Sequence, residues 1–484
     1  MVAPESSARL RAIIVGAGIG GLTTAHALHR AGIDYVVVEK HDDVLKPFGS
    51  TITLHPGQLR ILHQLGLLDR LKTLARPYNR GGEFRDSDGR LLSKFDLSSM
   101  RIKHGEAGML MNRESLIKIL YEALPDKSKV LTGRLIVAIA HEADSVQVQL
   151  SDGLSETGHL IIGADGVHSV VRSAMWEHAD ATNPGLIPPE DKKVVGCKWK
   201  LIWASGPEDP RLSNDVTVGS FPGRRCSIVL SQPGIATFIM IWKTSEAGPR
   251  SSQRRKYTAE DAEELMASIA RLPVNESVTF GDLWKNRFRQ GMSDTQVGVM
   301  KRWHHGRIVL VGDATFSITP TTGLGANMCI ENVAALVNAL HEAVVEATRQ
   351  GRGRPTGSDL EAAFHKYRDR QWPRTLYSYR FANFFDRLYS WDTPWMRFWA
   401  CCVARTLSMV LLPKLLSDHA RGVPVLKFVD LVGWPEGRIR WEHGEEEKGG
   451  GGGGRGGALA WMLLAVVVLL GAVGLAFVMG GGGI

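Results

Sequence analysis

The chain has few cysteines, and this scarcity narrows the classes of protein to which it can belong. Its 484 residues contain 5 cysteines, with no Cys-x-x-Cys pair and no spacing typical of metal ligands. A secreted domain stabilised by disulfides and a structural metal site are therefore disfavoured. The simple interpretation is that the protein resides in a reducing compartment. The residues before Arg11 are polar, so the N-terminus does not resemble a secretory signal.

Concentrated charge is also lacking. The formal net charge is +8, and the lysines and arginines are scattered along the chain. Nucleic-acid binding is disfavoured, and attraction to an anionic membrane surface fits better. Hydrophobic residues make up 44% and charged residues 22%, as in a globular protein, and the length predicts two domains with an appendage. The sequence shows no Ser/His/Asp or Cys/His motif of the kind that indicates nucleophilic catalysis.

A glycine-rich turn near the N-terminus is the most informative feature present. Gly16, Gly18 and Gly21 follow the apolar segment Ala12–Val15 and precede a helical pattern. This spacing allows a strand to turn into a helix whose N-terminus faces a pyrophosphate, so it predicts a bound dinucleotide. A second strand ends at Glu39, whose carboxylate is placed to accept hydrogen bonds from ribose hydroxyls and to repel a 2′-phosphate.

The pattern of elements predicts an α/β fold with a Rossmann-like parallel sheet, an inserted antiparallel sheet and a helical C-terminal region. Local signals predict hairpins over Glu83–Phe95 and around Ser151–Gly153, a helix opening at Met111–Ser115, a buried strand at His159–Gly163 and a helix over Gly325–Thr348. The predicted segments are 1–190 and 296–348 for the dinucleotide domain, 191–295 for the inserted substrate domain, 358–443 for the helical region and 444–457 for a Gly-rich tether.

The run Ala458–Met479 has no charged residue in 22 positions. As a helix it would be about 33 Å long, enough to span a hydrocarbon core of about 30 Å. It predicts a single C-terminal transmembrane anchor, and Lys448 and Arg455 on its N-terminal side predict that the large domain faces the cytosol, most simply at the endoplasmic reticulum. The apolar segment Pro394–Pro413 contains arginines, which favour a packed or membrane-grazing helix over a second span.

Three separated motifs resemble, in order and spacing, those of the group A flavoprotein monooxygenases. They are Gly16-x-Gly-x-x-Gly21, Ala164-Asp-Gly166 and Leu310-Val-Gly-Asp313. Within that family the fungal meroterpenoid epoxidases are most similar, through the segment Phe48–Gly57, the triplet Met111-Asn-Arg113 and the apolar tail. The resemblance implies FAD as cofactor, with NAD(P)H as a co-substrate that binds transiently.

The resemblance also assigns roles to single residues. It implies that Asp313 binds the ribityl chain of FAD, that Arg113 and the backbone of Gly49 contact FAD, and that Asp165 belongs to a motif associated with the diphosphate and NAD(P)H. The loop Thr315–Gly325 feeds a helix whose first amides, at Gly325, Ala326 and Asn327, are placed to stabilise the negative edge of a reduced flavin.

The chain departs from the family pattern at two places. Phe316 stands where many members have histidine after the third motif, and Glu331-Asn332 replaces an acidic pair in the following helix. The family often places an arginine or tyrosine facing the substrate on the first long strand of the inserted domain. Lys198 is the residue offered at that place, as a weak candidate beside the interpretation that Lys198 and Lys200 are solvated.

The hypothesis from the sequence is a monooxygenase that uses NAD(P)H and O₂ through a flavin C4a-hydroperoxide to epoxidise an alkene of a prenylated meroterpenoid-type intermediate. A membrane anchor suits an isoprenoid substrate, because such a chain partitions into a bilayer at about 0.8 kcal/mol per buried methylene. The alternatives are a phenolic-acid hydroxylase of the same family, and a non-catalytic flavoprotein or prenyl-binding escort. No metal and no nucleic-acid partner are expected.

Overall fold

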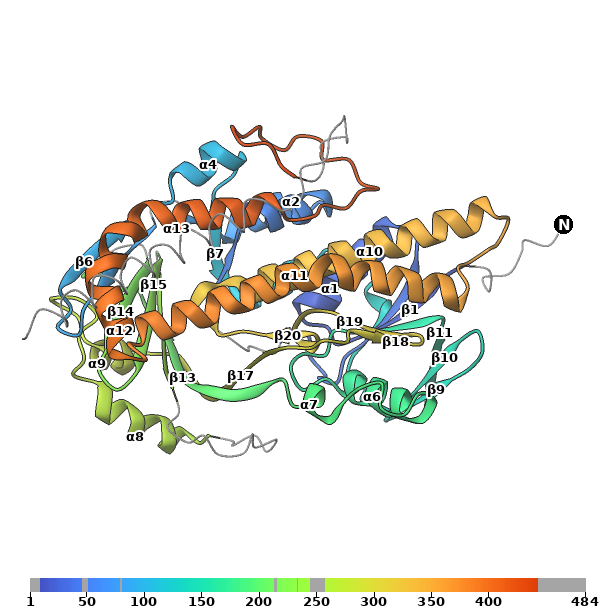
Figure 1. Ribbon diagram of the computed structural model, residues 1–484, viewed down its shortest axis with the longest axis horizontal. Coiled ribbons are helices and arrows are strands. Elements are labelled where there is room, and N and C mark those ends of the chain that lie inside the picture. The colour runs from blue at the N-terminus through green and yellow to red at the C-terminus, as the bar shows by residue number, and fades with distance from the viewer. Residues whose placement is uncertain are drawn as a thin grey trace, which may run out of the picture.

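The computed structural model describes residues 9–45, 51–78, 81–212, 216–232, 234–243 and 257–442. Figure 1 shows a parallel sheet at one end of the molecule and a large antiparallel sheet at the other. Two long helices run side by side along the length of the molecule, α10 (Leu324–Arg349) and α11 (Gly357–Tyr389). The predicted combination of a parallel and an antiparallel sheet is therefore present.

The parallel sheet has six strands in the order β18-β19-β12-β1-β2-β8. Its strands are β1 (Arg11–Val15), β2 (Asp34–Val38), β8 (Val130–Leu131), β12 (Leu160–Gly163), β18 (His304–His305) and β19 (Ile308–Leu310). Helix α1 (Ile19–Arg30) follows β1 directly, as predicted. The carboxyl ends of β1, β12 and β19 carry the three sequence motifs, and because these strands are parallel the motifs meet at one edge of the sheet.

A three-stranded antiparallel sheet packs its apolar side chains against this sheet. It consists of β9 (Ile136–His141), β10 (Val146–Leu150) and β11 (Ser155–Gly158), with the predicted turn at Ser151–Gly153 between the last two strands. The other helices that precede the inserted sheet in the chain are α2 (Pro56–Gln64), α3 (Leu68–Leu74), α4 (Ser99–His104), α5 (Arg113–Glu122), α6 (Val170–Thr182) and α7 (Pro189–Lys192), with a 3₁₀ turn at Lys127–Lys129.

A second three-stranded sheet contains β3 (Thr51–Leu54), β7 (Gly108–Asn112) and β4 (Arg76–Tyr78). Met111 lies in β7, so the helix that the sequence predicted to open at Met111 begins at Arg113. The reason is that Met111 pairs across the sheet with Ile52 and is buried there. This strand brings Arg113 to the point where the chain leaves the sheet.

The large antiparallel sheet has eight strands in the order β20-β17-β13-β16-β15-β14-β5-β6. Its strands are β5 (Gly82–Arg85), β6 (Leu91–Phe95), β13 (Gly196–Gly206), β14 (Val216–Phe221), β15 (Arg225–Gln232), β16 (Ile235–Lys243), β17 (Arg289–Val299) and β20 (Phe316–Ser317). The sheet is thus not confined to residues 191–295. The predicted hairpin of β5 and β6 joins it through a parallel pairing of β5 with β14.

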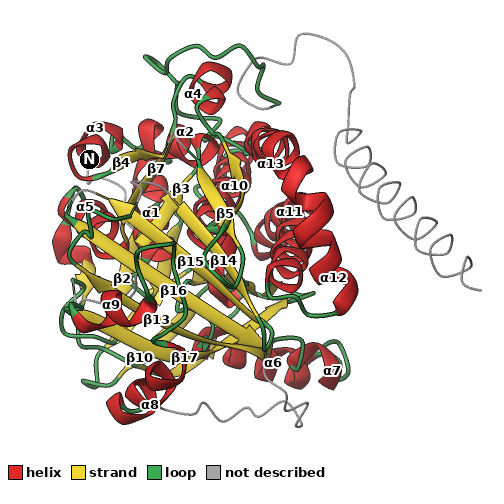
Figure 2. Cartoon of the chain, turned by 90° about the vertical axis from the view of Figure 1, so that its left-hand side faces the viewer, coloured by secondary structure: helices red, strands yellow, loops and turns green. Residues whose placement is uncertain are grey.

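Both faces of this sheet are covered at its centre, so β14, β15 and β16 are buried at nearly every position. Helices α8 (Ala259–Ile269) and α9 (Phe280–Lys285) pack against Phe238 and Met240 on one face. The other face, with Ile228 and Ile239, is turned to α11 and the C-terminal helices. Figure 2 shows these helices together along one side of the strands.

The segment after α11 is a bent helix rather than a single span. Helix α12 (Pro394–Phe398) passes through a π-helical turn at Trp399–Val403 into α13 (Ala404–Arg421). Within the described part of the chain, α10 is the single helix long and apolar enough to cross a membrane, and it is mostly buried against α1 and α11 as a core helix. The predicted anchor, Ala458–Met479, lies outside the described residues.

Candidate active site

The three glycines of the N-terminal turn have three different surroundings. Gly16 has φ +99°, and a Cβ there would lie 2.7 Å from the carbonyl oxygen of Ala164. A Cβ on Gly21 would lie 1.8 Å from the carbonyl oxygen of Gly16. Around Gly18, in contrast, the nearest atom to such a Cβ is Nη2 of Arg113, at 4.0 Å. Gly16 and Gly21 therefore allow close packing, whereas Gly18 leaves room for another molecule beside the backbone.

The amides that open α1 face this room. Gly18 is the residue that precedes the helix, and no side chain caps its first turn, which also contains no acidic residue. Uncapped helix N-termini carry partial positive charge and unsatisfied N–H donors, which suit a pyrophosphate. The turn thus has the space and the donors that the predicted dinucleotide needs.

Glu39 stands at the end of β2, as predicted, and is 8% exposed. Its carboxylate accepts hydrogen bonds from the backbone amides of Ala17 (2.7 Å) and His41 (2.9 Å), one on each oxygen. A carboxylate oxygen has a second lone pair, so both oxygens keep acceptor capacity for a ribose. Glu39 therefore fixes the glycine turn as well as standing where the adenosine end is expected.

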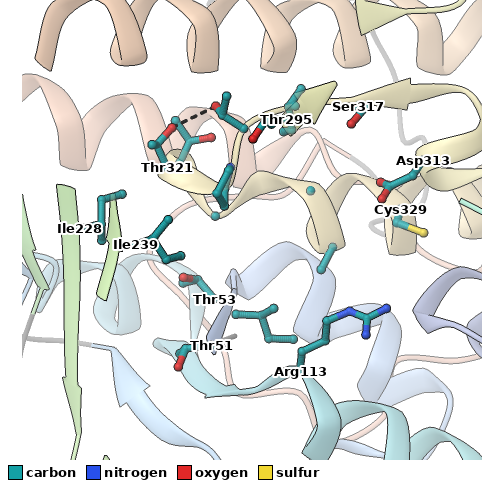
Figure 3. Close-up of a pocket in the computed structure, with 18 of the residues that line it drawn as sticks. Thr51, Thr53, Arg113, Ile228, Ile239, Thr295, Asp313, Ser317, Thr321 and Cys329 are labelled. Atoms are coloured by element: carbon teal, nitrogen blue, oxygen red, sulfur yellow. Dashed lines mark hydrogen bonds between the residues drawn. The ribbon is translucent and has the colours of Figure 1, made fainter. Parts of the chain in front are cut away.

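A cavity of about 510 Å³ extends from this turn to the antiparallel sheet (Figure 3). On the side of the parallel sheet its wall includes Gly18, Arg113, Gly166, Asp313 and Cys329. These residues come from segments that are far apart in the sequence and meet because β1, β12 and β19 end at the same edge. Of the residues predicted to bind the cofactor, Gly325 and Ala326 line the same cavity.

Asp313 and Arg113 both line this cavity, with Cys329 beside Asp313 (Figure 3). Asp313 is exposed, and it forms part of the cavity wall. Burial raises the pKa of the Asp313 carboxyl, and the charge of Arg113 opposes that shift. Burial likewise lowers the pKa of the Arg113 guanidinium, and Asp313 opposes it. The two charges therefore stabilise each other at the cavity wall.

The N-terminus of α10 forms the next part of the wall. Gly323 precedes the helix in the left-handed conformation (φ +65°), and no side chain caps the first turn. A Cβ on Gly325 would meet no atom within 4 Å. Asn327 is not part of the cavity wall, and its buried side chain bridges β3 to α10 through the carbonyl of Thr53 (2.6 Å) and the amide of His55 (2.9 Å). Free amides at Gly325 and Ala326 remain to face a negative charge.

Asp165 and Arg172 hold the motifs together rather than line the cavity. The Asp165 carboxylate accepts hydrogen bonds from the amides of Val170 (2.7 Å) and Val171 (3.2 Å), so it caps α6, while the backbone of Gly166 reaches the wall. Arg172, which follows the second motif in α6, is buried. Its guanidinium donates to the carbonyls of Val167 (2.6 Å) and Ala314 (3.1 Å), which ties the second motif to the third.

Three other positions singled out in the sequence lie away from the cavity or outside the description. Lys198 is exposed beside a β-bulge in β13 and is not part of the cavity wall, whereas Trp199 is buried as the alternation predicts. Phe316, which replaces the family's histidine, is fully buried in the core. Gly49 lies outside the described residues.

The half of the cavity toward the antiparallel sheet is mainly apolar, apart from the polar residues that β17 contributes at 293–296. Its wall consists of aliphatic side chains from β13 to β16, aromatic side chains from β4 to β6 and α11, and two leucines of α13: Leu201, Val216, Val218, Ile228, Leu230, Ile239, Tyr78, Phe84, Phe95, Phe381, Phe385, Leu412 and Leu416. Sequence reasoning did not find this wall, because its members share no local motif. The one signal was the aromatic content of the C-terminal helical region.

The sequence also missed a polar group behind this cavity. Asp386 of α11 is buried and accepts hydrogen bonds from Thr319 and Thr321, which line the cavity in the loop before α10. An acidic residue among aromatic neighbours was the available signal. Glu331, singled out as a departure from the family, is buried under α11 and accepts hydrogen bonds from Arg374.

The sequence matches one family along most of its length. The model of the FAD binding domain family matches residues 9–352. The FAD-dependent monooxygenase DEP2 of Alternaria brassicicola is 32% identical over 446 residues, which cover 90% of this chain and 82% of that protein. The FAD-dependent monooxygenase DEP2 of Fusarium langsethiae is 39% identical over 342 residues, covering 70% of this chain and 65% of that protein.

Solved structures share the fold at low sequence identity. Klebsiella pneumoniae HpxO complexed with FAD and uric acid has a TM-score of 0.67 and 22% identity, covering 85% of this chain and 96% of that one. A salicylate hydroxylase substrate complex has a TM-score of 0.65 and 18% identity, covering 86% of this chain and 98% of that one. The arrangement of a parallel sheet, an antiparallel sheet and a cavity between them is thus found in proteins that have been solved with FAD or a substrate bound.

Proposed function

This chain belongs to the FAD-dependent monooxygenases of the FAD binding domain family, and on that premise we propose that it epoxidises an alkene of a prenylated secondary-metabolite intermediate. When it is bound and reduced by NAD(P)H, FAD would activate O₂. One oxygen atom enters the substrate, and the other leaves as water. Each turnover therefore uses two electrons from NAD(P)H and one proton. The protein's contribution is to bind, orient and exclude water.

The described residues suit an elongated flavin dinucleotide. Uncapped amides at the start of α1 and the space at Gly18 suit the pyrophosphate, and Glu39 stands at the adenosine end. Asp313, which lines the cavity, would hold the ribityl hydroxyls, with Arg113 stabilising its charge. The amides of Gly325 and Ala326 would stabilise negative charge on the reduced ring. Apart from Glu39, these groups line one cavity, which is the fit expected for FAD.

The observation that carries the choice of substrate is the lack of a cation on the far side of the cavity. Among the described residues of the wall, Arg113 is the single arginine or lysine, and it lies with Asp313 on the side of the parallel sheet. A phenolic acid carries a carboxylate, and burying that charge without a cation beside it is costly. An isoprenoid chain needs only apolar contacts, which β14 to β16, α11 and α13 supply.

The substrate class is tested by incubating the full chain with FAD and NADPH and offering either prenylated aromatic compounds or phenolic acids. We expect NADPH oxidation that depends on the prenylated compound, and a product that has gained one oxygen atom at a prenyl double bond. Oxygen incorporated into the phenolic acid alone would replace this proposal with the hydroxylase alternative. Flavin binding without NADPH oxidation toward either substrate class would favour the non-catalytic escort.

The proposal includes attachment to the endoplasmic reticulum membrane through Ala458–Met479, with the catalytic domain on the cytosolic side. Its support is the charge-free composition of that run and the apolar cavity, since an isoprenoid substrate concentrates in the bilayer. Alkaline carbonate extraction of membranes tests it. The full chain should stay in the pellet, a variant lacking residues 458–484 should be released, and release of the full chain would overturn the anchor.

A further inference from the structure

A ring of three polar contacts lies between α11 and the cavity. The carboxylate of Asp386 accepts a hydrogen bond from the Thr319 hydroxyl at 2.6 Å and another from the Thr321 hydroxyl. The two hydroxyl oxygens are themselves 3.1 Å apart. Asp386 is 1% exposed, and both threonines are part of the cavity wall (Figure 3, where Thr321 is labelled).

The number of hydrogens in this ring depends on the state of Asp386. Each threonine hydroxyl has one hydrogen, whereas an ionised carboxylate has none. If both hydroxyls donate to an ionised Asp386, the 3.1 Å contact between Thr319 and Thr321 has no hydrogen and brings two lone pairs together. If Asp386 is protonated, it donates to one threonine, that threonine donates to the other, and the second donates back to the carboxyl. Three contacts then have three hydrogens.

The surroundings of Asp386 favour the neutral form, in contrast to a second buried aspartate on the same segment. Asp392 is paired with Lys243 (2.7 Å) and Arg387 (2.9 Å). Burial raises the pKa of the Asp392 carboxyl, but the hydrogen bonds from these two cations outweigh it and the pKa is lowered. No cation among the described residues is paired with Asp386, and burial raises its pKa to about 7 against the hydrogen bonds from the two threonines.

The other titratable groups near Asp386 carry no positive charge that would stabilise its ionised form. Cys226 lies on β15, and its pKa is raised by burial and by the charge of Asp386. Tyr389 lies one turn along α11, and burial raises its pKa as well. Both side chains therefore stay neutral. On β17 is Asp294, which accepts a hydrogen bond from Tyr257. Strand β14 has no titratable residue.

The C-terminal elements that pack against α11 carry other charges, but these have partners of their own. On α12, Arg397 lies over the ring of Trp391. Cys401 of the π-helical turn has its pKa raised by burial.

We propose that Asp386 is a positioning residue that carries a proton in the working enzyme, and that this proton closes a ring of hydrogen bonds which fixes Thr319 and Thr321 in the cavity wall. The loop that they fix leads through Gly323 into the first turn of α10, where the reduced flavin is expected. Loss of the proton removes one of the three hydrogen bonds and loosens this loop. The inference rests on membership of the flavoprotein monooxygenases and not on the choice of epoxidation.

Infrared spectroscopy of the holoenzyme without substrate tests the protonation directly. We expect a carboxylic-acid C=O stretch that disappears as the pH rises through about 7 and is absent from Asp386→Asn. Asp392→Asn is the matched control, because that aspartate is ionised and its loss should leave the band unchanged. The measurement needs no substrate, so a mistaken substrate class cannot affect it.

Two further measurements separate positioning from simple packing. Asparagine can donate to one threonine and accept from the other, so Asp386→Asn should retain activity and FAD above pH ~8, where the wild type loses both. Thr321→Val should release FAD more readily than the wild type near pH 6, whereas Thr321→Ser, which keeps the hydroxyl, should not.

Thermal unfolding gives a third readout. In the unfolded chain an aspartate titrates near pH ~3.9, whereas the folded pKa is about 7. The wild type therefore loses stability as the pH rises between these two values, and Asp386→Asn does not. The Tm of the variant relative to wild type should rise over that window and then level off. An unchanged infrared band in Asp386→Asn, or parallel pH profiles for variant and wild type, would overturn the proposal.

Discussion

Arg113 and Asp313 line the same cavity, and the charge of each shifts the pKa of the other (Figure 3). Arg113 opens α5 after a strand of the small sheet, and Asp313 follows the last strand of the parallel sheet. Two hundred residues separate them in the chain, yet they are joined by the fold. A ligand that enters between them meets both a hydrogen-bond acceptor and a fixed cation.

Replacing Asp313 with alanine should abolish flavin retention. The variant loses the acceptor for the ribityl hydroxyls and leaves Arg113 without its counter-charge. Hydrogen bonds to charged groups contribute about 1.5–3 kcal/mol, so FAD affinity should fall about 10- to 100-fold. Flavin absorbance of the purified protein measures it, with exposed Asp88→Ala as the control. Normal flavin content in Asp313→Ala would show that this carboxylate does not bind the cofactor.

Replacing Glu39 with glutamine should weaken FAD binding by about tenfold, because hydrogen bonds to a charged acceptor are lost or weakened. The amides of Ala17 and His41 both donate to this carboxylate, and the glutamine amide can accept only on its oxygen. Fluorescence titration of the apoprotein with FAD gives the dissociation constant. Glu114→Gln, which breaks a surface pair with Arg289, is the matched control and should bind FAD as the wild type does.

Local motifs predicted the part of the site that depends on short stretches of sequence. The glycine turn, Glu39 and the start of α10 lie within single strand-turn-helix units, so their spacing fixed their geometry. Gly16 and Gly21 are in contact with each other, and no distant residue is needed to explain them. The periodicity of apolar residues likewise predicted the hairpins and the long helices, because it too is a property of short stretches of sequence.

The remainder depends on contacts between distant residues and could not be predicted in this way. Strands β5 and β6 join a sheet built more than a hundred residues later, through a pairing of Val216 with Gly82 that no local signal encodes. Asp165 was expected to bind the cofactor; two amides of α6 donate to its Oδ2, a contact that the motif did not predict, and the cofactor role stays a prediction. Lys198 was placed on a plausible strand, yet a β-bulge and its exposure keep it from the cavity. Asp386 has no motif at all.

Alanine substitutions at Gly21 and Gly325 should have different effects on the stability of the protein. Gly21→Ala places a Cβ 1.8 Å from the carbonyl oxygen of Gly16, so the turn cannot form and the protein should fail to fold or lose FAD together with much of its stability. Gly325→Ala meets no protein atom within 4 Å, so its Tm as apoprotein should match the wild type. Because the added methyl would occupy space in which the flavin is expected to bind, the affinity for FAD should still fall. Unchanged affinity in Gly325→Ala would place the cofactor elsewhere.

A polar residue in the apolar wall should impair substrate binding selectively. Ile228 on β15 lines the cavity and is 6% exposed. Ile228→Asn should raise the KM for a prenylated substrate about tenfold, since burying an unpartnered amide costs about 1–3 kcal/mol. The KM for NADPH and the flavin content should not change. Ile228→Val, which keeps the apolar surface, should stay within about threefold of the wild type. Equal effects on NADPH and substrate would argue against this wall as the substrate site.

Oxygen transfer from O₂ is the central claim, and isotopic labelling tests it most directly. The full chain is incubated under ¹⁸O₂ with FAD, NADPH and a prenylated aromatic compound, and the product is analysed by mass spectrometry. The account predicts one ¹⁸O atom per product molecule, at a former prenyl double bond, with NADPH consumed in proportion to product. Product oxygen derived from water, or NADPH oxidation with no oxygenated product from any prenylated compound, would contradict it.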